Sequence, residues 1–177
     1  MRWCFVLFLF FDLCLASPAA TLQYLTLDDL VAQSTAIVRG TVTGSHTVLR
    51  GPVVYTAYSL SVGETWKGSV GSTVDVAVPG GVSSGVRQTF AGAPMLTAGT
   101  DYLVFLWTSK SGLNVIMGLS QGLFELLSQG PGLDAMVAQS GSSEIMLGAM
   151  GRQVSARPIH MHLGEFHAAV RRAMGVH

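Results

Sequence analysis

PMLTAGTDYLVFLWT, residues 94–108, is the stretch that decides the fold of this chain. A turn-forming Ala-Gly-Thr-Asp segment at residues 98–101 leads into residues 102–107, which are apolar at every position. A short continuous apolar run between glycine and polar turn residues is typical of a strand that is buried on both faces. We therefore predict a central strand at residues 102–107, with the neighbouring segments packed around it.

The neighbouring segments alternate apolar and polar residues with a period of two, which is the pattern of half-buried strands. Turn residues rich in Gly, Pro and Ser separate them. Short strands with Gly-rich turns predict an all-β fold, and we expect a small OB-like β-barrel over residues 17–127. The further strands are expected at residues 36–43, 53–62, 73–78, 86–90, 113–117 and 121–127.

Short helices are expected at both ends of the barrel. Near residues 26–33, Thr26 is placed as an N-cap and two acidic residues follow in the first turn. Near residues 162–174, apolar residues recur on one face at helical spacing. The remaining residues from 128 onward are interpreted as a Gly/Ser-rich edge segment that leads into the C-terminal helix, so that residues 128–177 form one unit.

The first residues have the layout of a secretory signal peptide. Arg2 precedes an unbroken apolar stretch at residues 3–11, and small residues allow cleavage after Ala16 or after Ala19. The apolar stretch is too short to span a bilayer comfortably. We predict a signal peptide at residues 1–16, no transmembrane span after its removal, and a secreted or periplasmic protein.

The cysteines and the charges narrow the class of protein. Both cysteines, Cys4 and Cys14, lie in the predicted leader, so we expect no disulfide in the mature chain. An exported chain without disulfides is more typical of bacteria than of eukaryotic extracellular proteins. Ten basic and ten acidic residues give a net charge of zero. Nucleic-acid binding requires a basic surface, so we expect no nucleic-acid partner.

Three segments resemble the netrin-like or tissue-inhibitor-of-metalloproteinases type of OB-fold domain, in a cysteine-free exported bacterial form. They are LVAQSTAIVRGTV (residues 30–42), YSLSVGETWKG (58–68) and LTAGTDYLVF (96–105), and together they cover most of the expected barrel. The resemblance implies the fold. The inhibitors of that family chelate a protease zinc through an N-terminal cysteine, which has no counterpart at the predicted mature start, Ser17 or Ala20.

Residues 81–85, Gly-Val-Ser-Ser-Gly, match the G-x-S-x-G pattern of a nucleophile elbow. That chemistry needs a strand, a strained turn and then a helix, with the serine exposed on the turn. Residues 86–90 show no helical face, so an ordinary Gly/Ser loop is the better interpretation. A serine hydrolase that uses Ser83 is kept as an alternative.

Three histidines in the tail, His160, His162 and His167, cluster with Glu165. On an extended segment the first two project to the same side, and imidazoles so placed can bind zinc or copper. No recognised metal-ligand spacing is present. His162 can instead begin the C-terminal helix, with Glu165 three residues on as in a capping box. The three histidines are weak metal candidates, and no metal or cofactor is predicted.

Loops that a rigid barrel holds in place are where a binding site is expected. Most aromatic residues lie on strand faces that should be core, whereas Trp66 and Phe90 lie in predicted connections and are the best candidates for exposure. The glycine-rich loop between them adds three positions. The predicted binding-loop residues are Trp66, Gly80, Gly81, Ser83 and Phe90.

No persuasive catalytic set accompanies this fold. The sequence therefore predicts a non-enzymatic exported binding or interaction domain, whose partner would be another exported protein or an envelope component. Two alternatives remain open. One is a protein inhibitor of an extracellular protease that acts through loops, and the other is the serine hydrolase described above.

Overall fold

The computed structural model describes residues 21–130, 134–139, 145–148, 150–155 and 158–175. The protein is mainly β, with two short helices. In chain order the elements are β1 (Thr21–Gln23), α1 (Leu27–Gln33), β2 (Ala36–Arg50), β3 (Val53–Lys67), β4 (Thr73–Pro79), β5 (Gly81–Ser83), β6 (Val86–Gln88), β7 (Asp101–Thr108), β8 (Asn114–Ile116), β9 (Leu123–Leu127), β10 (Met136–Gln139), β11 (Ile145–Leu147), β12 (Gln153–Val154), β13 (His160–His162) and α2 (Leu163–Ala173).

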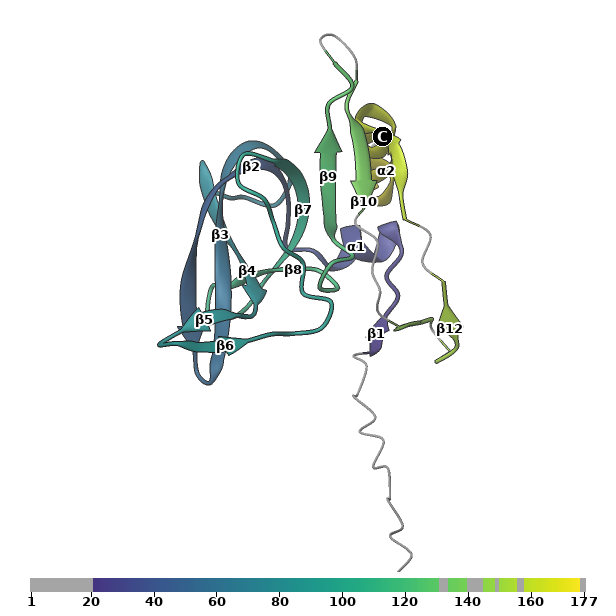
Figure 1. Ribbon diagram of the computed structural model, residues 1–177. Coiled ribbons are helices and arrows are strands. Elements are labelled where there is room, and N and C mark those ends of the chain that lie inside the picture. The colour runs from purple at the N-terminus through teal and green to yellow at the C-terminus, as the bar shows by residue number, and fades with distance from the viewer. Residues whose placement is uncertain (1–20, 131–133, 140–144, 149, 156–157, 176–177) are drawn as a thin grey trace, which may run out of the picture.

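Most strands belong to one sheet, in the order β13-β10-β9-β7-β2-β3-β4-β8. β8, at the end of this order, also pairs with β7. The five strands β7, β2, β3, β4 and β8 are therefore hydrogen-bonded in a ring. The ring occupies the left of Figure 1, and β9, β10, β13 and α2 lie to its right. The short β5–β6 hairpin lies at one end of the ring.

β7 is the central strand that the sequence predicts. It pairs with β2 on one edge and with β9 on the other. Val104 and Leu106 belong to the apolar cluster inside the ring, whereas Leu103 and Phe105 belong to a second cluster outside it. All four side chains are fully buried. A strand that is covered on both faces explains why its sequence is continuously apolar.

The two clusters divide the core of the protein. The outer cluster lies between the sheet and the helices, and three phenylalanines form its centre: Phe105, Phe124 and Phe166. Their ring centroids lie 4.8–6.3 Å apart, within the range of favourable aromatic pairs. The inner cluster consists of Ala36, Val38, Val42, Tyr58, Leu60, Val74, Val76, Val78, Leu96, Tyr102, Val104, Leu106, Ile116 and Leu123.

The first long hairpin differs from the prediction. The strand expected at residues 36–43 does not end before Gly44 but continues to Arg50. Gly44 instead sits at a register shift between β2 and β3, a bulge that lets the strand bend without ending. β3 likewise continues through the predicted connection to Lys67. Residues 81–83, predicted as loop, form β5.

Both predicted helices are confirmed. Thr26 caps α1 through a reciprocal capping box, in which its hydroxyl accepts from the Asp29 backbone N–H and the Asp29 carboxylate accepts from the Thr26 N–H. His162 is the N-cap residue of α2, but its side chain makes no capping hydrogen bond, so the predicted capping box with Glu165 is absent there.

The C-terminal third is joined to the ring by hydrogen bonds. β10 pairs with β9 and with β13, which extends the sheet beyond β7. β1 pairs in parallel with β11, and β11 pairs with β12, so the first described strand shares a small sheet with two strands of the C-terminal third. The predicted signal peptide, residues 1–16, lies outside the described residues. No helix in the described part of the chain is long and apolar enough to cross a membrane.

Candidate functional site

The β5–β6 hairpin is held against the start of β3 by side-chain and backbone hydrogen bonds. The Gly80 N–H donates to the Val54 carbonyl at 2.8 Å, and the Gly80 carbonyl accepts from the Thr56 hydroxyl at 2.9 Å. The Gln88 side chain accepts from the Val54 N–H and donates to the Pro52 carbonyl, both at 2.8 Å. These bonds fix the hairpin as a rigid wall at this end of the ring.

The structure of this hairpin shows whether residues 81–85, which match G-x-S-x-G, form a nucleophile elbow. Ser84 and Gly85 both have positive φ angles, 50° and 79°, as the two central residues of a type I′ turn require. Ser83 therefore lies in a strand that turns into another strand, β6, and not into a helix. The helix N-terminus that a nucleophile elbow uses to hold an oxyanion is missing from this position.

A hollow of about 220 Å³ lies beside this hairpin. Its exposed rim carries Phe90, which is 43% exposed, and Met95, which is 86% exposed. Large apolar side chains that remain exposed next to a hollow are a feature of binding surfaces. The lining residues are Thr56, Tyr58, Val78, Pro79, Gly80, Gly81, Arg87, Gln88, Thr89, Phe90, Ala93, Pro94 and Met95.

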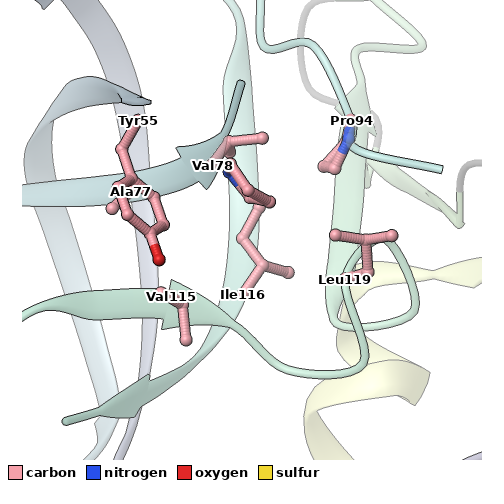
Figure 2. Close-up of a pocket in the computed structure, with 8 residues that line it drawn as sticks. Tyr55, Ala77, Val78, Pro94, Val115, Ile116 and Leu119 are labelled. Carbon is pink, nitrogen blue, oxygen red and sulfur yellow. The ribbon is translucent and has the colours of Figure 1, made fainter. Parts of the chain in front are cut away.

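A second hollow of about 230 Å³ lies where β4 and β8 separate (Figure 2). A single residue pair, Ala77 with Val115, joins these two strands, and their pairing does not continue beyond it. Pro94 and Leu119 form one wall of this hollow. Leu119 has a φ of 65°, a strained conformation for a residue with a branched side chain.

The two hollows form one apolar surface. Val78, Pro79 and Pro94 line both of them, so the surface runs from the β5–β6 hairpin to the point where β4 and β8 separate. Four of the five predicted binding-loop residues, Gly80, Gly81, Ser83 and Phe90, lie in this hairpin or line the first hollow. We call the whole surface the ring-end surface.

Trp66 lies elsewhere, at the end of a strand and not in the predicted connection, and it is only partly exposed. It is the penultimate residue of β3 and packs against α2, with its ring 6.4 Å from Phe166 and 4.4 Å from His167. The next residue, Lys67, donates to the carbonyls of Val31 and Ser34 at the end of α1. These two neighbouring side chains tie both helices to the ring.

A network of charged and polar groups continues from Trp66 along the outside of the ring. Glu64 accepts from the Trp66 indole N–H at 3.0 Å and pairs with Arg39 at 2.7 Å. Arg39 also lies 3.6 Å from Asp101, which accepts a hydrogen bond from Thr41. The bond from Trp66 lowers the pKa of Glu64, and Arg39 lowers it further. The network is therefore built around an ionised Glu64.

The tail histidines do not gather into a metal site. His160 and His162 are exposed on β13, whereas His167 lies on α2 against Trp66. Within the described residues, no group of three His, Cys, Asp or Glu side chains could hold a metal ion. The position of His167 is explained by aromatic stacking.

Among the residues of the ring-end surface that sequence reasoning missed are Arg87, Met95 and Leu119. Met95 adjoins the central stretch, but a lone methionine before a strand gives no sign of its exposure. Leu119 lies in a Gly-Leu-Ser segment whose left-handed backbone would have been assigned to a glycine. For Arg87 the sequence offers one signal: it is the single charged residue between residues 76 and 100.

Comparison with known proteins adds no family to this geometry. No protein-family model, no curated protein and no solved structure matches the chain.

Proposed function

We propose that this protein is an exported, non-enzymatic binding domain, and that it binds its partner through the ring-end surface. The observation that carries this proposal is the pair of adjoining hollows beside the exposed side chains of Phe90 and Met95. A rigid scaffold that presents apolar side chains from its connecting segments is a common arrangement for recognition. The leader-like residues 1–16 and a remaining chain without cysteine support export.

We further infer that the ring is a small closed barrel of the OB-like, netrin-like type. Closing a sheet into a barrel requires the register to be staggered after one circuit. Val115 pairs with Trp107, and extending the β7–β2 register by one residue beyond its last pair, Leu106 with Ala36, places Trp107 opposite Thr35. On its other side Val115 pairs with Ala77, which leads through β3 to His46. One circuit therefore advances from Thr35 to His46 along β2, a stagger that supports a five-stranded barrel.

The test is an affinity pull-down from the exported and envelope proteins of the organism that makes this chain. The bait is the mature form of this chain, from Ser17 onward, and the test variant carries the substitution Phe90→Ser. Leu127→Ser is the matched control, because Leu127 is 42% exposed and Phe90 is 43% exposed, while Leu127 lies on β9 away from the ring-end surface. We expect one stoichiometric partner, lost with Phe90→Ser and kept with Leu127→Ser.

Other outcomes decide against the proposal or refine it. A partner that is retained by Phe90→Ser and lost by Leu127→Ser places the binding surface elsewhere. If the protein hydrolyses a substrate and Ser83→Ala removes that activity, the hydrolase alternative is correct and the binding function is not. A protease as the partner, inhibited by the wild-type protein, identifies the binding domain as a loop-based inhibitor.

A further inference from the structure

The outer edge of β6 is available for pairing. Among the described strands, β6 pairs with β5 alone. Residue pairs in an antiparallel ladder alternate between those that exchange hydrogen bonds and those that do not. Ser83 and Val86 close the two-residue turn as a hydrogen-bonded pair, so the following residue, Arg87, directs its backbone N–H and C=O away from β5. An added strand would find its first donor and acceptor at Arg87.

This end of the molecule is positively charged. Residues 76–100 contain one charged residue, Arg87, and residues 47–60 contain only Arg50. The bond from Gln88 to Pro52 brings β6 beside the β2–β3 turn that carries Arg50 (Figure 1). Among the described residues, no carboxylate lies within ion-pair distance of either arginine. Two cations without acidic neighbours favour an acidic ligand.

The free edge adjoins the first hollow. Arg87 and Gln88 line that hollow together with Phe90 and Met95. Side chains of an extended peptide alternate between the two faces of the sheet that it joins. A peptide paired with Arg87 would therefore bring every second side chain toward the hollow, which is lined largely by apolar groups. Backbone pairing with pockets for alternate side chains is a known mode of peptide recognition.

We propose that the ring-end surface binds an extended segment of an exported partner in which an acidic residue stands beside a large apolar residue. The segment adds a strand to the outer edge of β6 through the backbone of Arg87. Its apolar side chain enters the hollow beside Phe90, and its carboxylate pairs with Arg87 and Arg50. This inference rests on the proposed function and specifies the chemistry of the partner.

A displayed library of random hexapeptides, selected on the exported protein, tests the chemistry. We expect enrichment of peptides that combine Glu or Asp with Leu, Ile, Phe or Tyr. Arg87→Glu should weaken the selected peptides by about tenfold or more and shift a new selection toward Lys and Arg. Arg152→Glu is the control, because Arg152 is exposed and lies beside β12, far along the chain from β6. It should leave the enriched peptides unchanged.

Amide hydrogen exchange tests the added strand. With a selected peptide bound, exchange of the Arg87 N–H should slow by at least about tenfold. The Val86 and Gln88 N–H groups are the internal controls, because they already point toward β5 and should change little. Protection of Val86 and Gln88 without protection of Arg87 would overturn strand addition.

The failures of the two proposals are distinguishable. A native partner that depends on Phe90 but is unaffected by Arg87→Glu leaves the binding function standing and removes the acidic peptide. A selection with no acidic preference removes it as well. Binding of anionic phospholipid vesicles, with no peptide enriched, replaces the peptide by a membrane surface.

Discussion

The helix-covered core and the ring-end surface are built from similar residues that are used in opposite ways. Under the helices, Phe105, Phe124 and Phe166 pack against one another and are fully buried. At the ring end, Phe90 and Met95 lie beside hollows that no side chain of the described residues fills. The first region contributes a packed apolar core, whereas the second keeps large apolar side chains exposed to solvent. Substitutions can test this division, because each region offers residues that are matched in type.

The largest expected effect comes from removing a ring in the helix-covered core. Phe105→Ala should lower the free energy of unfolding by about 3–5 kcal/mol, because a fully buried side chain is replaced by a cavity. Phe90→Ala should cost about 1 kcal/mol or less, because much of that side chain is already in water. Denaturant unfolding measures both. Equal losses would contradict the division between the two regions.

A pair of glycines gives the next largest difference. Gly68 and Gly85 have similar φ angles, 77° and 79°. A Cβ on Gly68 would lie 2.4 Å from the Thr35 carbonyl oxygen, whereas one on Gly85 would meet nothing within 4 Å. Gly85→Ala should cost about 1–2 kcal/mol through backbone strain alone. Gly68→Ala should cost at least about 1 kcal/mol more, because the backbone must also move. Similar costs in thermal unfolding would show that the close approach is unimportant.

A smaller loss of stability is expected at Lys67, which belongs to the helix-covered part of the molecule. Lys67→Met keeps the apolar stem but removes the ammonium that binds the last carbonyls of α1. We expect a loss of about 1.5 kcal/mol in the free energy of unfolding, typical of hydrogen bonds to a charged group. Lys110→Met, in an exposed turn, should change stability little. If Lys67→Met left the free energy of unfolding unchanged, water would satisfy these carbonyls equally well.

The smallest effect is a pH dependence. The pKa of Glu64 is lowered in the folded protein, mainly by the bond from Trp66, from an ordinary value of 4.5. Its stabilisation is therefore complete above that value and is lost as the pH falls through the lower folded-state pKa. Comparing urea unfolding at pH 6 and pH 3, Glu64→Gln should reduce the acid-induced loss of stability. An unchanged loss would assign the acid sensitivity to other groups, such as Asp29, whose pKa is also lowered, first by its bond from the Thr26 hydroxyl.

The strands and helices could be predicted because their signals are local. The apolar run at residues 102–107 and the capping residue Thr26 each act through their nearest neighbours, and the structure contains both features. Gly44 misled the prediction because a glycine permits a turn or a bulge equally well, and pairing with β3 decides between them. Trp66 misled it because α2, which covers it, lies about a hundred residues later in the chain.

The ring-end surface could be predicted only in part. The glycine-rich segment at residues 80–85 indicated that the chain changes direction there, and Phe90 stood out as an aromatic residue in a connection. The hollows themselves depend on how Pro94 and Leu119 approach β4, which is a tertiary arrangement with no local signal. Arg87 acquires significance only because the hairpin places it on a free strand edge.

The parallel pairing of β1 with β11 sets an order on the making of this protein. Thr21 faces Ile145 in that pairing, so the first described strand has no partner until nearly the whole chain has been synthesised. The ring, whose strands all lie between Ala36 and Ile116, can form earlier. β1 therefore stays unpaired until β11 has been made, so the small sheet that β1, β11 and β12 share is completed only after the ring strands are available.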